Sequence, residues 1–143
     1  MRGFSLVELV VVLLVMAVLG AVALPRLTDR RALQERGARD QLRGLILQAR
    51  KVALTQQREV CVLLTAAGAA AVYAPGGACS PGQPVLDPSG DGNLRMDMPV
   101  GMALAAAQPL RFDTRGRPVA ATDRVVAVGT LSLTVYRETG LAQ

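Results

Sequence analysis

The sequence contains no histidine and no tryptophan, and only two phenylalanines and two tyrosines. Without histidine there is no His-based general acid or base, no Ser–His or Cys–His nucleophile pair and no His-ligated metal site. The chain also has no phosphate-binding glycine loop, no paired carboxylates and no nucleophile–base set. These absences indicate that the protein is not an enzyme, and they imply no cofactor.

Lysine is almost absent as well, because 15 of the 16 basic residues are arginines. Residues 26–58 contain nine basic and three acidic side chains, while the whole chain has a net charge of +5. A basic segment suits an acidic partner such as nucleic acid or phospholipid headgroups, but arginines on a solvated helix face give the same pattern. The scarcity of aromatic side chains argues against a stacking platform for single-stranded nucleic acid.

The N-terminal segment is where the apolar residues concentrate. Glu8 is followed by sixteen uncharged residues, 9–24, and then by Pro25. Residues 4–24 form a helix of roughly 31 Å at about 1.5 Å per residue, close to the thickness of a bilayer core. A carboxylate inside such a segment is costly, so Glu8 is a candidate functional residue.

Three interpretations of this segment remain open from the residues alone. A secretory signal peptide would be cleaved after Ala23 and release a soluble domain, although Glu8 interrupts its apolar stretch. A plain membrane anchor explains the length and leaves Glu8 without a role. In the third interpretation, the motif Gly3-Phe4-Ser5-Leu6-Val7-Glu8, the apolar run and Pro25 together resemble the N-terminus of type IV pilin-like proteins.

That resemblance implies processing and assembly. A prepilin peptidase would cleave after Gly3 and methylate the new α-amine of Phe4, and Glu8 would pair with the Phe4 amine of a neighbouring subunit. The first turn of a helix favours such a carboxylate, and a low-dielectric bundle requires a partner for each charge. The expected partners are other pilin or pseudopilin subunits, the peptidase and the inner membrane, with nucleic acid as an alternative.

Later stretches extend the resemblance over nearly the whole chain. Those around residues 48–62, 110–118 and 136–140 are similar to H-type minor pseudopilins and related minor pilins. Residues 26–37 make it most similar to a minor pilin of mannose-sensitive haemagglutinin (MSHA) type pili. The resemblance implies a single-pass inner-membrane protein with a periplasmic body that later joins the tip or initiation complex of a pilus or a type II secretion pseudopilus.

The second helical segment is amphipathic. An apolar stripe with helical spacing predicts that the helix continues to about residue 57 and that one face is buried. Residues 28–41 are much more polar, so we expect an exposed stalk there, and Pro25 should kink the helix. The residues of the stripe are Leu42, Leu45, Ile46, Ala49, Val52 and Ala53.

From Glu59 onward the pattern changes to short apolar runs separated by turns. These runs predict strands, and 114–117 between them predicts a tight turn that exposes Arg115 and Arg117 as candidate DNA or anion contacts. The fold class is therefore α+β, a pilin-like fold with a long N-terminal helix packed on an antiparallel sheet. The expected strands are 60–64, 69–73, 100–104, 110–112, 125–128 and 131–136. The expected parts are a leader (1–3), a transmembrane assembly helix (4–25), an amphipathic helix (26–57) and a β-rich domain (58–143).

Two further features carry candidate chemistry. A disulfide between Cys61 and Cys79 would suit an extracytoplasmic body and stabilise it by roughly 3 kcal/mol, the alternative being two unrelated thiols. Asp87, Asp91 and Asn93 lie in a loop that partly matches a calcium-binding pattern, but Met98 stands where that pattern has a bidentate Glu. An Asp/Gly/Asn turn without an ion explains the loop equally, so no metal is the primary expectation.

Overall fold

The computed structural model describes residues 5–27, 30–90, 92–105 and 108–143, and within 5–27 it describes the side chains of 5–19 and 21. The chain divides into two compact units, Met1–Leu33 and Gln34–Gln143. We call the second unit, residues 34–143, the body. Helix α1 (Leu6–Leu27) belongs to the first unit, and most of helix α2 (Arg30–Gln56) belongs to the body.

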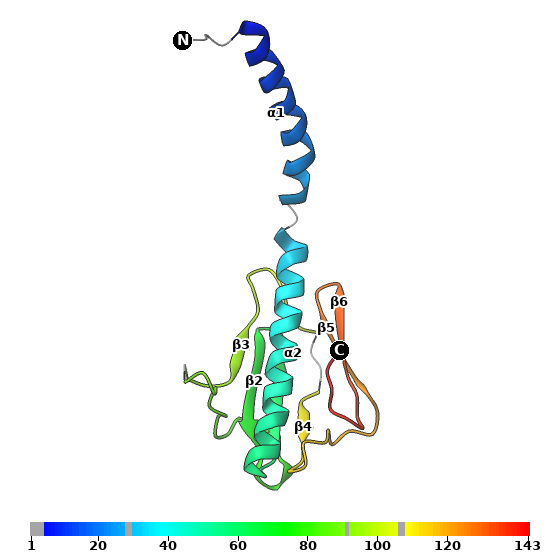
Figure 1. The fold of residues 1–143 in the computed structure, drawn as a ribbon. Coiled ribbons are helices and arrows are strands. Elements are labelled where there is room, and N and C mark those ends of the chain that lie inside the picture. Colours follow the sequence, from blue (N-terminus) through cyan, green and yellow to red (C-terminus); the bar gives the residue numbers. More distant parts are fainter. Residues whose placement is uncertain (1–4, 28–29, 91, 106–107) are drawn as a thin grey trace. The chain divides into compact units, whose positions relative to one another are not determined.

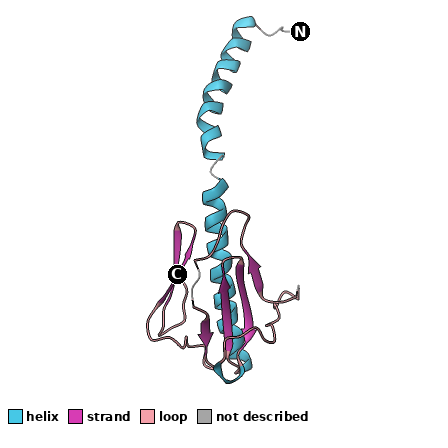
Figure 2. Cartoon of the chain, turned by 180° about the vertical axis from the view of Figure 1, so that it is seen from behind, coloured by secondary structure: helices cyan, strands magenta, loops and turns pink. Residues whose placement is uncertain are grey.

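The body is an α+β structure in which α2 lies against one face of an antiparallel sheet (Figure 1, Figure 2). This sheet has the strand order β3-β2-β1-β4, and a separate two-stranded sheet pairs β5 with β6. The strands are β1 (Val60–Thr65), β2 (Gly68–Tyr73), β3 (Arg95–Asp97), β4 (Leu110–Phe112), β5 (Arg124–Val128) and β6 (Leu131–Val135).

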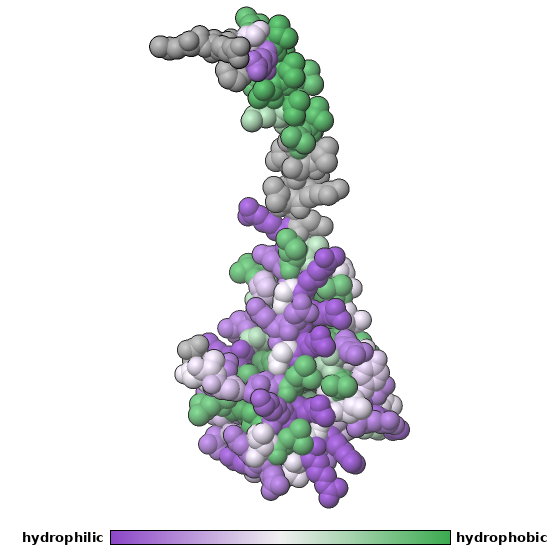
Figure 3. All heavy atoms as spheres, in the orientation of Figure 1, coloured by the Kyte–Doolittle hydropathy of each residue, from purple (hydrophilic) through white to green (hydrophobic). Residues whose placement is uncertain are grey.

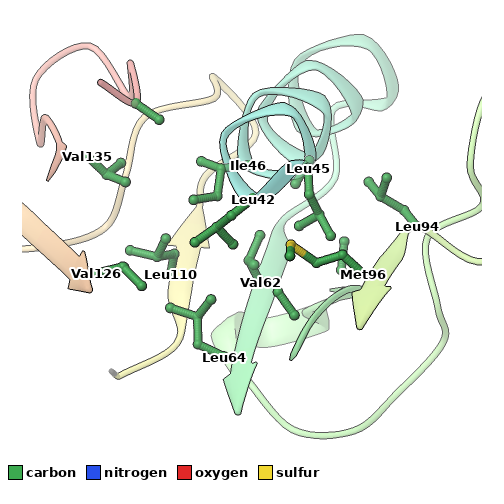
Figure 4. Packing of buried hydrophobic residues seen from close by; sticks show 14 of the residues in the cluster. Leu42, Leu45, Ile46, Val62, Leu64, Leu94, Met96, Leu110, Val126 and Val135 are labelled. Atoms are coloured by element: carbon green, nitrogen blue, oxygen red, sulfur yellow. The ribbon is translucent and has the colours of Figure 1, made fainter. Parts of the chain in front are cut away.

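The apolar stripe of α2 forms the centre of the core. All six residues of the expected stripe are buried, and Figure 4 shows Leu42, Leu45 and Ile46 facing side chains of the strands. Because side chains alternate along a strand, Val60, Val62 and Leu64 of β1 point into this core. On the opposite face of β1, Cys61 packs with Val72 in a second apolar cluster.

The expected strands are largely confirmed, with one correction between residues 94 and 104. The strand expected over 100–104 does not form; Pro99–Met102 is a turn, and only Leu104 makes an isolated bridge, to Val128. The unpredicted β3 lies at the sheet edge instead. Its single buried side chain, Met96, gives too short an alternation for a strand to be read from the sequence.

The stalk expected over residues 28–41 is also corrected. Glu35 and Ala38 are buried, with 6% and 2% of their surfaces exposed, so the packed part of α2 begins near Glu35. The β5–β6 turn covers this point: the Thr130 hydroxyl donates to Glu35 Oε2 at 2.6 Å, and the Thr130 amide lies 3.4 Å from the same oxygen. Gly129 permits the close approach, because a Cβ there would lie 2.8 Å from the Glu35 carboxyl carbon.

Candidate functional site

The start of α1 places Glu8 in the first helical turn. The helix begins after Ser5, whose carbonyl accepts a hydrogen bond from the Leu9 amide at 3.2 Å. An acidic side chain is favoured here because the helix dipole places partial positive charge at this end. The spacing of Ser5 and Glu8 also matches a capping box, which is a local role for Glu8 in addition to the expected pairing.

Glu8 is exposed, so its carboxylate is open to a partner from outside the chain. The proposed cleavage and methylation residues, Gly3 and Phe4, lie outside the described residues. The pairing of Glu8 with a Phe4 amine therefore stays a prediction.

The rest of α1 presents apolar side chains to its surroundings. Twelve large apolar residues between Leu6 and Leu19 are exposed, each by at least 45% of its surface. Figure 3 shows apolar residues gathered over α1, whereas polar residues dominate the visible face of the body. A helix that is apolar all round requires a non-aqueous neighbour.

Within the described residues, no helix is both long and apolar enough to cross a membrane. The transmembrane role expected for residues 4–25 stays a prediction. Pro25 lies inside α1, two residues before its end, but its side chain is outside the described set. The kink expected at Pro25 stays a prediction.

A disulfide joins Cys61 on β1 to Cys79 in the loop after β2, with Cα atoms 5.6 Å apart. It holds that loop over the face of the sheet opposite α2. A second attachment comes from β4, where Arg111 Nη1 donates to the Gly77 carbonyl at 2.8 Å. The loop and the disulfide thereby cover the second apolar cluster of the body.

The candidate calcium loop is held by its own hydrogen bonds. Asp87 Oδ1 accepts from the Ser89 amide at 3.0 Å, and the Asp87 amide donates to the Gly92 carbonyl at 2.8 Å. Asp91 lies outside the described residues, and Leu86 forms a bridge with Asn93 across the turn. Among the residues that are described, no group of three His, Cys, Asp or Glu side chains is arranged to hold a metal.

The turn over residues 114–117 forms as the sequence predicts. Asp113 organises it, because its Oδ1 accepts from the amides of Arg115 at 2.9 Å and Arg117 at 2.7 Å. The turn leaves Arg115 and Arg117 exposed.

The structure adds an arginine that the sequence could not assign to this turn. Arg50 of α2 donates from Nε to the Gly116 carbonyl at 3.1 Å, which attaches a third arginine to the turn that carries Arg115 and Arg117. Because 66 residues separate the donor and acceptor in the sequence, only the packing of α2 against this turn reveals the group. We call Arg50, Arg115 and Arg117 the arginine group.

Comparison with known proteins found a likeness in fold. No family model matches the chain, and no curated protein matches it significantly. A crystal structure of the type IV minor pilin FimU of Pseudomonas aeruginosa aligns with a TM-score of 0.57 at 19% identity, over 82% of this chain and 90% of that chain. A second crystal form of FimU aligns with a TM-score of 0.54 at 18% identity, over 76% of this chain and 90% of that chain. The chain therefore has the pilin fold, as the sequence predicts.

Proposed function

We propose that the protein is a minor pilin-like structural subunit that assembles with other pilin subunits. The observation that carries the proposal is the combination of the pilin fold with an α1 whose apolar side chains are exposed on all sides. Such a helix is suited to packing among the equivalent helices of neighbouring subunits. The body then presents its surfaces to the bodies of those neighbours.

The finer features of the proposal come from the N-terminal motif. Residues 4–25 lie in the inner membrane before assembly, with the body in the periplasm, since residues 9–24 carry no charge. The peptidase cleaves after Gly3 and methylates Phe4, and Glu8 then pairs with the Phe4 amine of the next subunit. The resemblance of residues 26–37 to an MSHA-type minor pilin and the H-type character of the body favour a place in a tip or initiation complex, in a pilus or a pseudopilus.

The mass of the mature N-terminus tests the class of the protein. A chain that begins with methylated Phe4 is expected. A chain that begins at Leu24 would identify a signal peptide and a secreted domain. An uncleaved chain would support the interpretation of the segment as a plain membrane anchor. Either result would overturn the proposed processing.

Assembly is tested separately with Glu8→Gln, which keeps the size of the side chain and removes its charge. The variant should be cleaved normally but enter filaments poorly, because a buried ammonium then lacks a carboxylate partner. Glu138→Gln is the matched control, because Glu138 is exposed in the body and makes only a 3.8 Å contact to Arg137. Normal incorporation of the Glu8 variant would refute the pairing.

A second candidate function, binding of DNA or another polyanion, is favoured by the arginine group. Three guanidiniums beside one exposed turn can contact phosphates, and each phosphate contact steepens the dependence of binding on salt. The Arg115→Gln and Arg117→Gln double variant should weaken binding to duplex DNA and reduce its salt dependence. Arg95→Gln, at an exposed residue of β3, is the control. Binding that is absent, or unchanged in the double variant, would exclude this function.

A further inference from the structure

Three turns of the body lie at the end where the chain enters it, at Gln34. Strand β1 starts at Val60, soon after α2 ends, and runs back along the helix, so the β1–β2 turn lies near the start of the packed part of α2 (Figure 1, Figure 2). The β5–β6 turn lies at the same end, because Thr130 hydrogen-bonds Glu35. The loop after β3 is the third, and Figure 1 shows it rising beside the same part of α2.

Two of these turns form one continuous surface. The Met98 amide donates to the Ala67 carbonyl at 2.8 Å, and the Leu104 amide donates to the Ala66 carbonyl at 3.3 Å. The loop after β3 is therefore attached to the β1–β2 turn at both of its ends. We call residues 65–68, 98–105 and 128–132 together the entry face.

The entry face carries no charged residue, although 19% of the residues in the chain are charged. Its exposed members are mainly small or apolar, among them Ala66, Ala67, Val100, Ala103 and Ala105, whereas Leu104 and Val128 are buried beneath them. The opposite end of the body differs, because the arginine group lies there beside the last turns of α2. The three turns of the entry face thus lack charge, whereas the turn at the opposite end carries the arginine group together with Asp113.

Val100 is the most prominent residue of the entry face. Its side chain is fully exposed, at 102% of the reference area, between Met98 and Met102, which are partly buried against the core. The Met102 amide donates to the Pro99 carbonyl at 3.0 Å, and Gly101 supplies the positive φ of +81° that this tight turn requires. The turn therefore presents an apolar side chain outward while part of its backbone is already hydrogen-bonded.

We propose that the entry face rests on a lipid surface. An uncharged, apolar turn with internal hydrogen bonds enters the boundary between headgroups and acyl chains at little cost. The chain also connects the body at this end to the segment over residues 9–24, which carries no charge. The inference rests on the proposed function in one respect, namely that this segment lies in lipid.

Fluorescence quenching by lipid tests the proposal, because the chain has no tryptophan and any introduced one reports alone. The full chain is reconstituted in vesicles of phosphatidylcholine and phosphatidylglycerol with brominated acyl chains. Val100→Trp reports on the entry face. Val119→Trp is the matched control, because Val119 is also exposed, at 45%. Its amide donates to the carbonyl of Arg111, which pairs with Cys61 near the start of β1 and so lies towards the opposite end of the body. Val12→Trp reports on insertion of α1.

Quenching of the Val100→Trp variant should exceed that of the Val119→Trp variant at least about twofold, with emission shifted to shorter wavelength. If the Val12→Trp variant is quenched and the other two are alike, α1 lies in lipid and the entry face does not, which refutes this inference alone. If none of the three is quenched, the lipid location of α1 and the inference fail together. If the Val100→Trp variant is shielded from aqueous acrylamide but not quenched by bromine, a protein covers the face and the lipid proposal is wrong.

Discussion

Replacing Thr130 by valine should destabilise the body through the buried carboxylate of Glu35. Valine keeps the shape of threonine and removes the hydroxyl that donates to Glu35 Oε2 at 2.6 Å. The backbone amide of residue 130 remains, but it lies 3.4 Å from the same oxygen and is the weaker donor. The change therefore removes the shorter of these two hydrogen bonds from a group that is only 6% exposed.

The expected cost follows from the chemistry of the acceptor. A hydrogen bond to a charged group contributes about 1.5–3 kcal/mol. We expect the free energy of unfolding to fall by about 1.5–3 kcal/mol. For a unit of this size, that is a loss of roughly 5–12 °C in Tm.

Urea unfolding of the full chain in detergent, followed by far-ultraviolet circular dichroism, measures this change. Thr130→Ser is the matched control, because it keeps the hydroxyl and should remain within about 0.5 kcal/mol of the unsubstituted chain. If the valine and serine variants unfold at the same urea concentration, the hydroxyl contributes nothing. The burial of Glu35 would then need another explanation.

Three further predictions concern the same body. Gln57→Gly should stabilise it by about 0.5–1 kcal/mol in urea unfolding, because Gln57 directly follows α2 with a φ of +48° that glycine adopts without strain; no gain would contradict backbone strain at this position. Gly129→Ala should lower stability by about 1–3 kcal/mol, because its Cβ would approach the Glu35 carboxylate to 2.8 Å at a φ of +60°; an unchanged unfolding midpoint would contradict this contact. Replacing both Cys61 and Cys79 by alanine should cost about 3 kcal/mol for a sequence separation of 18 residues, measured under non-reducing conditions. Equal stability of the reduced and oxidised wild-type chains would contradict it.

Periodicity made the central packing predictable. The α2 stripe follows from apolar spacing of 3.6 residues, and strands β1, β2, β4, β5 and β6 follow from short apolar runs between turns; both are properties of each segment alone. All six predicted stripe residues are buried, and every strand pair is antiparallel. The turn that exposes Arg115 and Arg117 followed from its glycine and polar residues in the same local way.

What the sequence could not provide depends on contacts between distant segments. The sequence places Glu35 in a polar stretch that is expected to be exposed, because its partner Thr130 is 95 residues away. Arg50 is equally inconspicuous among the other arginines of α2 until the helix packs against Gly116. The division of the strands into two sheets has the same origin, because strand pairing across long loops leaves no periodic signal.

The exposed surface of α1 is the feature from which the functional argument proceeds. Exposing a Val, Leu or Met side chain costs about 1.5–3 kcal/mol relative to burying it, so twelve such residues on one helix strongly favour an apolar neighbour. Lipid and a bundle of apolar helices both satisfy that requirement. Glu8 separates them, because lipid offers a carboxylate no partner, whereas a bundle of processed subunits offers one α-amine for each carboxylate. The helix dipole and the capping box also favour an acid at this position in a plain anchor, so the comparison of Glu8→Gln with Glu138→Gln in filament incorporation decides between assembly and anchoring.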